Sequence, residues 1–219
     1  MIRIEEVSRR YADTCALDGV SLSIDAGEFV AITGPSGCGK STLLNLMGGL
    51  DQPDSGRIFA DGMALHSADE RALTEYRRRR LGIVFQFFNL LPGLTVAENV
   101  EIPLLLAGAT AGMMRRRALE CIEMAGLSHR ASGFPHQLSG GEMQRAAIAR
   151  ALVHEPAILL ADEPTGNLDS SNAAQVIESL LKIASQRLVT MVVVTHSEAV
   201  AATARRQVQM LDGKIASHG

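Results

Sequence analysis

The residues with the strongest chemical pattern are Gly34-Pro35-Ser36-Gly37-Cys38-Gly39-Lys40-Ser41-Thr42, which match the spacing G-x-x-x-x-G-K-[ST]. Glycines at these positions let the backbone fold into a tight cup whose N–H groups face phosphate oxygens. In this arrangement Lys40 reaches the β- and γ-phosphates of a nucleotide, and the Ser41 hydroxyl ligates Mg²⁺. A helix that begins here adds the partial positive charge of its N-terminus. The pattern therefore predicts nucleotide binding, and we interpret Cys38 as a small filler within the cup.

Two carboxylates end a short apolar run, Ala157-Ile158-Leu159-Leu160-Ala161-Asp162-Glu163-Pro164. A buried strand that ends in two charges is costly unless a cation or hydrogen-bond donors compensate them. Asp162 is therefore placed to hold Mg²⁺, and Glu163, which points a different way, can take a proton from an attacking water. A solvated turn before Pro164 is the alternative, and the phosphate-binding pattern elsewhere in the chain makes it the weaker one.

A third pattern is Leu138-Ser139-Gly140-Gly141-Glu142-Met143-Gln144-Arg145. Ser139 and Glu142 have the spacing of a capping box, so an ordinary helix start explains part of it. A helix start alone does not explain the two glycines, because glycine in the first turn of a helix costs backbone entropy. They leave a bare helix N-terminus that can approach a phosphate closely.

These residues need a framework of strands and helices to bring them together. Alternation of strands and helices at both ends of the chain, around a helical middle, predicts a parallel sheet with an inserted helical subdomain in one unit. The run Arg77–Arg80 is interpreted as a solvated helix end. The stretch 86–110 is expected to be loop-rich. Apolar patterns predict strands over 1–7, about 17–24, 29–33, 81–85, 157–161 and 189–194, and helices over 41–50, 69–80, 113–125, 140–153 and about 171–186.

Composition excludes several classes of function. The net charge of −3 gives no basic field for nucleic acid, and the 219 residues contain no apolar run long enough to span a bilayer. The first residues lack the apolar core of a signal peptide, so a cytoplasmic location is expected. Three widely spaced cysteines match neither a disulfide framework nor a zinc site.

The segment Leu138–Arg145 resembles the signature motif of ABC ATPases. The order of the other motifs is similar to that family along essentially the whole chain: Tyr11, Gly34–Thr42, Gln86, the signature, Asp162-Glu163, Gly166-Asn167-Leu168-Asp169 and His196. The resemblance implies an α/β fold, a P-loop NTPase (RecA-like) core with an antiparallel β subdomain and an inserted α-helical subdomain. Residues 1–219 would form a single ABC ATPase domain, with its core in 1–86 and 157–219 and the helical signature subdomain in about 87–156.

The resemblance also implies roles for single residues, with ATP and Mg²⁺ as ligands. Tyr11 would stack on adenine, Gln86 would sense or ligate Mg²⁺ and the attacking water, and His196 would contact the γ-phosphate. Asp169 would belong to a loop that touches a second copy of the chain. Two simpler interpretations stay open, since Tyr11 could be a half-buried aromatic residue at a strand end and Asp169 a helix N-cap.

In the implied pair of subunits, two copies lie head to tail, and each ATP is held by one copy's Gly34–Thr42 loop and the other's signature residues Ser139, Gly140, Gly141 and Glu142. Gln86–Val100 and Asp162–Asp169 further resemble the lipoprotein-release and macrolide-export branch, in which glutamate at position 142 is common. Such members act with transmembrane permease subunits, at the cytoplasmic face of the inner membrane. Phe87-Phe88 and Leu90-Leu91 suit a groove near Gln86–Leu91 for a partner's coupling helix, or equally a core of the helical subdomain.

The sequence thus predicts an ATP-binding and ATP-hydrolysing subunit of an ABC transport complex, for export or extraction of lipoprotein, lipid or small-molecule cargo. The alternative is an ATP-gated regulator of a membrane partner in a cell-division-type complex. ABC ATPases that act on DNA or ribosomes carry long insertions or a second ATPase half, for which 219 residues leave no room. No fused regulatory domain is expected after about residue 215.

Overall fold

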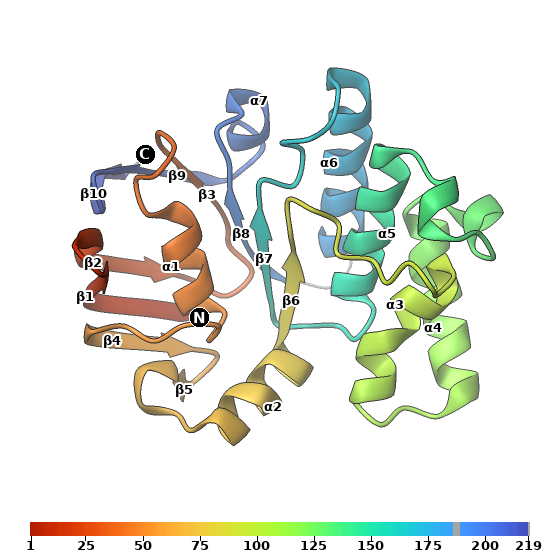
Figure 1. The fold of residues 1–219 in the computed structure, drawn as a ribbon, viewed down its shortest axis with the longest axis horizontal. Coiled ribbons are helices and arrows are strands. Elements are labelled where there is room, and N and C mark those ends of the chain that lie inside the picture. The colour runs from red at the N-terminus through yellow and green to blue at the C-terminus, as the bar shows by residue number, and fades with distance from the viewer. Residues whose placement is uncertain (186–188, 219) are drawn as a thin grey trace.

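A six-stranded sheet forms the centre of the protein, in the strand order β10-β9-β3-β8-β7-β6 (Figure 1). The computed structural model describes residues 1–185 and 189–218. Strands β9, β3, β8, β7 and β6 run parallel, and β10 pairs antiparallel with β9. The strand bounds are β3 Phe29–Thr33, β6 Leu81–Val84, β7 Ile158–Asp162, β8 Thr190–Val194, β9 Arg206–Leu211 and β10 Lys214–His218. Strands β3, β7 and β8 are continuous apolar runs because helices and the second sheet cover both of their faces.

A second, antiparallel sheet has the order β2-β1-β4-β5 and lies on the left in Figure 1. Its strands are β1 Ile2–Tyr11, β2 Thr14–Ile24, β4 Ser55–Ala60 and β5 Met63–Ala64. The β1–β2 hairpin is longer than the predicted strands 1–7 and 17–24, and continues to the pair Tyr11 and Thr14. Register shifts between Ile4 and Arg10 break the alternation of apolar and polar residues there. An alternating pattern therefore does not predict the full length of the strand.

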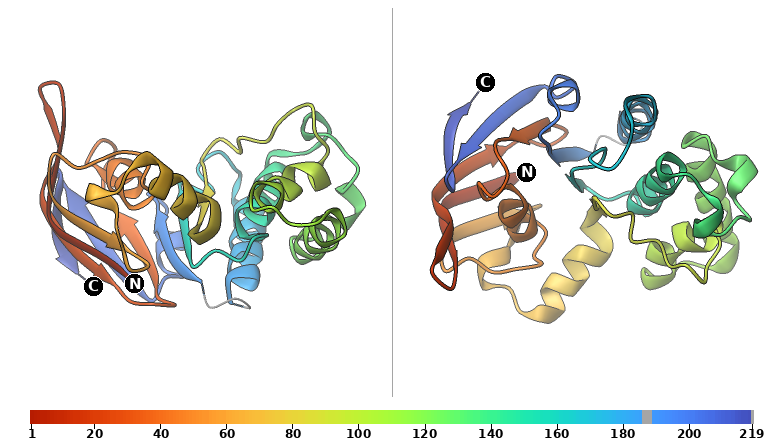
Figure 2. Two further views of the ribbon diagram at one scale, coloured as in Figure 1. Left: turned by 90° about the horizontal axis from the view of Figure 1, so that it is seen from below. Right: turned by 45° about the horizontal axis from the view of Figure 1, so that its top comes forward.

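Helices flank the parallel sheet and form a separate group beyond β6 (Figures 1 and 2). The predicted helices are present, and the final residue of the one predicted over 171–186 lies outside the described residues.

At the end of α2 (Glu70–Arg80), Arg78, Arg79 and Arg80 are exposed as interpreted, whereas Arg77 is partly buried and donates to the Gly49 carbonyl. The bounds are α1 Lys40–Met47, α2 Glu70–Arg80, α3 Val96–Leu106, α4 Ala111–Met124, α5 Gly140–Leu152, α6 Ser170–Ser185 and α7 Glu198–Ala201, with short 3₁₀ turns at Leu65–Ser67, Ser128–Arg130 and Pro135–Gln137.

Helix α3 occupies Val96–Leu106, nearly half of the stretch 86–110 that was predicted to be loop-rich, and corrects that prediction there. It begins in a capping box, in which the Thr95 side chain accepts from the Glu98 N–H and the Glu98 carboxylate accepts from the Thr95 N–H. Pro103 lies inside the helix, although proline in a helix interior usually indicates a break. The helix tolerates it because packing against α4 and α5, rather than propensity, stabilises this segment. The predicted strands also left out β4, β5, β9 and β10.

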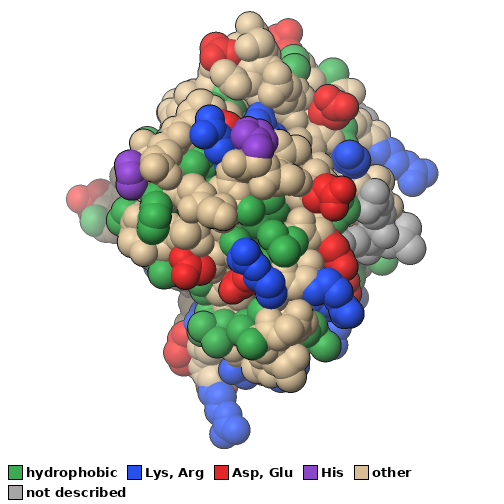
Figure 3. Space-filling model, turned by 90° about the vertical axis from the view of Figure 1, so that its right-hand side faces the viewer, with side chains coloured by type: hydrophobic (Ala, Val, Ile, Leu, Met, Phe, Trp, Pro, Cys, Tyr) green, Lys and Arg blue, Asp and Glu red, His purple; other side chains and the backbone are tan. Residues whose placement is uncertain are grey.

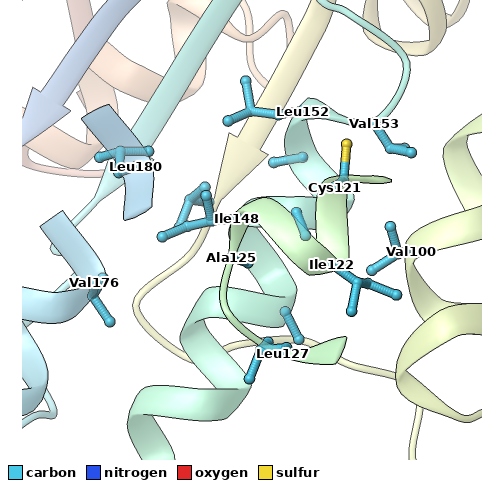
Figure 4. Close-up of a cluster of buried hydrophobic side chains, with 14 of the residues drawn as sticks. Val100, Cys121, Ile122, Ala125, Leu127, Ile148, Leu152, Val153, Val176 and Leu180 are labelled. Carbon is cyan, nitrogen blue, oxygen red and sulfur yellow. The ribbon is translucent and has the colours of Figure 1, made fainter. Parts of the chain in front are cut away.

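Two hydrophobic clusters hold the elements together. One lies between the antiparallel sheet, α1 and one face of the parallel sheet. The other joins the opposite face of that sheet to α3, α4, α5 and α6, and Figure 4 shows Ile122, Ile148, Leu152 and Leu180 among its side chains. The helical insertion therefore shares its core with the sheet that carries β7. These observations confirm the predicted α/β fold class, while the boundaries at 86/87 and 156/157 stay a prediction.

Gly82 in β6 offers a test of how closely α5 packs on the sheet. A β-carbon at Gly82 would lie 2.2 Å from the Ala151 carbonyl oxygen, and both positions are backbone, so strand and helix would have to separate. We expect Gly82→Ala to lower the free energy of unfolding by about 1–3 kcal/mol, measured by chemical denaturation. Gly93→Ala is the control, because a β-carbon there meets no atom within 4 Å. Equal stability of the two variants would contradict this packing.

Candidate active site

The phosphate-binding pattern forms a tight loop between β3 and α1. Gly34 and Gly39 have φ angles of 147° and 103°, in the region that favours glycine. A β-carbon at Gly34 would lie 2.2 Å from the Met210 carbonyl oxygen, and one at Gly39 would lie 2.3 Å from the Ala16 carbonyl oxygen. Both glycines are therefore required by the close approach of neighbouring backbone. The loop is the cup that the sequence predicts.

Lys40 begins α1 and lies across the inside of this loop. Its side chain is buried, with only 7% of the residue exposed, and its ammonium group donates to the carbonyl oxygens of Gly34 at 2.9 Å and Pro35 at 2.8 Å. An ammonium group has three donors, and the third faces the Cys38 sulfur, a weak acceptor that a phosphate oxygen can replace while the loop is held closed. Cys38 is also buried, consistent with a filler, and its sulfur lies 3.9 Å from the Lys40 nitrogen.

Ser41 and Asp162 come together although they are far apart in sequence. The Ser41 hydroxyl donates to an Asp162 carboxylate oxygen at 3.1 Å. Burial raises the pKa of the Asp162 carboxyl, the Ser41 hydrogen bond lowers it, and the neighbouring charge of Glu163 raises it further. A cation at this position would relieve both the burial and the repulsion. A hydroxyl and a carboxylate are oxygen ligands of the kind that Mg²⁺ prefers, so the pair fits this metal.

Glu163 follows Asp162 at the end of β7 but turns away from it. Its φ of 45° places a non-glycine residue in the left-handed region, which costs of order 1–3 kcal/mol and turns the chain sharply. Two backbone bonds hold the turn, from the Glu163 N–H to Val194 O at 2.9 Å and from the Gly166 N–H to Glu163 O at 3.0 Å. The carboxylate accepts from the His196 backbone N–H at 3.3 Å and lies 2.8 Å from His196 Nδ1. The strained turn therefore aims Glu163 at His196, at the end of the neighbouring strand β8.

These groups share one open cavity of about 510 Å³ at the carboxyl ends of β3, β7 and β8. Ligands of open α/β sheets bind in this position. Of the predicted residues, Ser36, Gly37, Gly39, Lys40, Ser41, Thr42, Gln86, Asp162, Glu163 and His196 line the cavity. Gly34, Pro35 and His196 line an adjoining hollow on the other side of the loop.

The remaining predicted residues lie outside this cavity. Tyr11 ends β1, and the signature residues begin α5. Sequence reasoning missed Thr14 and Ala16, which line the cavity from β2. Thr14 pairs with Tyr11 across the hairpin, which could have indicated its position, whereas no local pattern indicated Ala16.

The signature residues form a helix start with a capping box. Ser139 accepts from the Glu142 N–H at 3.3 Å, and the Glu142 carboxylate accepts from the Ser139 N–H at 2.8 Å and from Arg130 at 2.9 Å. A β-carbon at Gly141 would lie 2.6 Å from the Asn172 amide oxygen of α6. A side chain at position 141 would therefore have to displace the Asn172 side chain, a packing constraint that the sequence pattern alone did not reveal.

The pKa of Glu142 is lowered to about 2, first by the Ser139 backbone hydrogen bond and then by Arg130. Because the folded-state pKa lies below the ordinary value of 4.5, the carboxylate stabilises the fold above about pH 4.5 and loses this contribution as the pH falls toward about 2. We expect the difference in free energy of unfolding between wild type and Glu142→Gln to shrink over that range. Urea denaturation at a series of pH values measures it, and a constant difference would contradict the assignment.

Asp169 is the N-cap residue that one of the two interpretations expects. Its carboxylate accepts from the Asn172 backbone N–H at 2.9 Å, from the Asn172 amide at 2.7 Å and from the Ser171 hydroxyl at 2.8 Å. These bonds, led by the Asn172 backbone, lower the pKa of Asp169 to about 2. The cap also fixes Asn172 against Gly141, so the Asp169 loop and the start of α5 are joined within one chain.

Helix α5 also holds the segment that contains Gln86. Gln144 donates to the Phe85 carbonyl at 3.3 Å, and Arg150 donates to the carbonyls of Phe88 at 2.9 Å and Asn89 at 2.5 Å. From the other side, the Asn167 amide donates to the Gln86 carbonyl at 3.1 Å. Hydrogen bonds from the helical insertion and from the loop after β7 therefore hold the backbone around Gln86 on both sides.

A family model for the ABC transporter matches residues 17–166, which include the phosphate-binding loop, the signature and the acidic pair. The chain belongs to the ABC transporter family. It is 44% identical over 215 residues to the lipoprotein-releasing system ATP-binding protein LolD of Bacteroides fragilis, covering 98% of this chain and 100% of the relative. It is 47% identical over 219 residues to the macrolide export ATP-binding/permease protein MacB of Burkholderia pseudomallei, covering 98% of this chain and 33% of that longer relative.

Two solved structures of MJ0796, a Methanocaldococcus jannaschii relative, match the whole ABC chain. The first, a dimeric cassette, has a TM-score of 0.93 at 44% identity and covers 100% of this chain and 98% of that one. The second, a dimeric post-hydrolysis state bound to ADP and Pi, has a TM-score of 0.91 at 42% identity with the same coverage. This ABC protein is therefore an ATP-binding subunit that hydrolyses ATP. Within the described residues, no helix combines the length and apolar character that crossing a membrane requires.

Proposed function

We propose that this protein is the ATPase of a membrane complex of the lipoprotein-release or macrolide-export type. In this proposal two copies close around two ATP molecules, and hydrolysis lets them reopen. The observation that carries it is the cavity at the strand ends, where the phosphate-binding loop, the Asp162 carboxylate and the Glu163–His196 pair face one space. Relatives named for lipoprotein release and macrolide export support the choice of branch.

The triphosphate would lie in the loop before α1. Backbone N–H groups of the loop and the remaining Lys40 donor would bind the phosphate oxygens. Ser41 and Asp162, which already share a hydrogen bond, would hold magnesium, with Gln86 beside them on the cavity wall. Bound Mg²⁺ supplies positive charge that favours the phosphate-transfer transition state.

Glu163 would act as the base. Its carboxylate is held by the His196 backbone N–H and imidazole, which leaves it oriented when a water enters. His196 is exposed, and its Nδ1 faces Glu163, so its Nε2 is the nitrogen available to the γ-phosphate. A neutral imidazole donates from one nitrogen only, so simultaneous donation to Glu163 and phosphate requires the imidazolium form.

The signature residues would complete the site of a second copy. Ser139 and Gly140 are reachable from solvent at the N-terminus of α5, outside the cavity of their own chain. A helix N-terminus favours an anion, and the triphosphate of the opposite copy is such a group. The solved relative described as a dimeric cassette supports this arrangement. Because the γ-phosphate would touch both copies only when closed, ATP would shift the balance toward the closed pair.

The membrane partner would dock in an apolar groove of about 370 Å³ between the parallel sheet and the helical insertion. Leu91 and Leu106 line it and are 50% and 61% exposed, while Arg150 lies at its wall and holds the segment after Gln86. Figure 3 views the side formed by the helical insertion, where hydrophobic side chains reach the surface between charged ones. Phe87 is 69% exposed, whereas Leu90 packs on the core, so each of the two earlier interpretations fits part of this segment.

Purification from detergent-solubilised membranes through a tag on this chain tests the docking. We expect an integral membrane permease to co-purify with the wild type, to be lost with Leu106→Asp and to be retained with Leu211→Asp. Leu211 is a matched control because it is 51% exposed on β9, outside the groove. Retention of the permease by Leu106→Asp would overturn the assignment of this groove as the docking site.

Reconstitution of the purified complex in lipid vesicles tests the cargo. ATP-dependent release of a lipidated protein, or transport of a macrolide, is the expected result. ATP-dependent structural change in the permease without movement of either cargo would instead identify an ATP-gated regulator.

A further inference from the structure

A cluster of ion pairs beside the end of the β1–β2 hairpin fixes the side chain of Tyr11. Tyr11 itself does not line the nucleotide cavity. Tyr11 is 43% exposed and ends β1. It is paired in register with Thr14, which lines the cavity wall together with Ala16. An exposed tyrosine at a strand end is ordinarily free to change rotamer. Here the side chain is held at both its hydroxyl and its ring.

The hydroxyl is held by Asp51. It donates to the Asp51 carboxylate at 2.5 Å, a short distance typical of a bond to a charged acceptor. Asp51 follows α1 at the start of the segment that leads to β4, and its carboxylate is in turn bound by Arg9 through two nitrogens, at 3.1 and 2.8 Å. The Gln52 N–H adds a further bond at 2.8 Å. Asp51 is therefore itself fixed before it fixes Tyr11.

The ring is held by Arg9. The Arg9 guanidinium carbon lies 4.8 Å from the centre of the Tyr11 ring, within the range of a cation–π contact. Asp54 binds the same guanidinium at 2.7 Å, and its other oxygen accepts from the Arg10 N–H at 2.7 Å. One face of the ring is thus covered by a cation that two carboxylates hold. The opposite face is the one on which a flat ring can stack.

We infer that Asp51, with Arg9, is a positioning residue that holds Tyr11 ready to stack on the base of the bound nucleotide. This inference rests on the proposed role of Tyr11 as the adenine platform. Orienting the ring before binding removes the cost of ordering it during binding, and that cost corresponds to about a 3- to 10-fold change in affinity. The phosphate contacts of Lys40 and its loop do not pass through Asp51, so the effect is confined to ligands that carry a base.

Titration calorimetry with ATP and with inorganic tripolyphosphate, which has no base, tests the inference. Asp51→Ala and Tyr11→Phe are each expected to raise the Kd for ATP about 3- to 10-fold and to leave the Kd for tripolyphosphate unchanged. The double variant is expected to match the single ones, because all three lose the same hydrogen bond. Asp13→Ala is the control: it removes a carboxylate from the same hairpin, one with no hydrogen bond or ion pair to the described residues.

Tyr11→Ala distinguishes the role of Tyr11 as the adenine platform from the positioning role of Asp51. If Tyr11→Ala weakens ATP binding but Asp51→Ala and Tyr11→Phe do not, the positioning role of Asp51 is overturned and the platform stands. If Tyr11→Ala leaves the Kd for ATP unchanged, the platform itself is wrong. Equal loss of ATP and tripolyphosphate binding in Asp51→Ala would reveal general damage to the site and would also overturn the inference.

Discussion

Replacement of Glu163 by glutamine is expected to lower the rate of ATP hydrolysis by about 10²- to 10⁴-fold, the usual contribution of a positioned general base. Glutamine keeps the size of the side chain and can still accept from the His196 N–H, so the turn after β7 should persist. The amide cannot take a proton from water. ATP binding should therefore change little while turnover is lost, which steady-state hydrolysis and equilibrium binding measure separately.

Glu198→Gln is the matched control for this variant. Glu198 is an exposed carboxylate in the first turn of α7, two residues beyond His196, and it does not line the main cavity. We expect its hydrolysis rate to stay within a factor of about two of the wild type, because an exposed surface charge contributes little. Wild-type turnover in Glu163→Gln would remove Glu163 from the role of base.

Replacement of Lys40 by alanine is expected to lower kcat/KM for ATP by about 10²- to 10³-fold, the scale of a lost preorganised donor. Lys40 is buried and joins the carbonyls of Gly34 and Pro35 across the loop, so alanine removes both a phosphate donor and the bond that closes the cup. Unlike Glu163→Gln, this change should weaken nucleotide binding itself. Calorimetric titration with ATP distinguishes the two.

Lys214→Ala controls for the loss of a lysine. Lys214 forms a surface ion pair with Asp18 at 3.0 Å, and its side chain is 63% exposed. Its removal is expected to leave ATP binding unchanged. If Lys40→Ala also bound ATP as the wild type does, the loop before α1 would not be the phosphate site.

Much of the cavity was predictable from the sequence because its residues lie where chain direction dictates their position. Parallel strands β3, β7 and β8 end at one edge of the sheet, so the loop after β3, the acidic pair after β7 and His196 after β8 had to meet there. Glycine spacing identified the loop because only glycine permits the backbone contacts of Gly34 and Gly39.

Other features depend on contacts between segments distant in sequence, which local patterns do not encode. The crowding at Gly141 comes from Asn172 in another helix, and the orientation of Tyr11 comes from Asp51. Helix α3 was missed because Pro103 signals a break, and packing outweighs that signal. Bulges in β1 concealed the hairpin that brings Thr14 and Ala16 to the cavity wall.

The proposed ATPase cycle requires that two copies of the chain share each ATP. The direct measurement is the molar mass of the Glu163→Gln variant by light scattering, with and without ATP and Mg²⁺. We expect the mass of a single chain without nucleotide and twice that mass with it. Ser139→Arg should abolish the doubling and leave ATP binding intact, because Ser139 lies outside the cavity of its own chain. A mass that stays at one chain while ATP is bound would contradict the shared site.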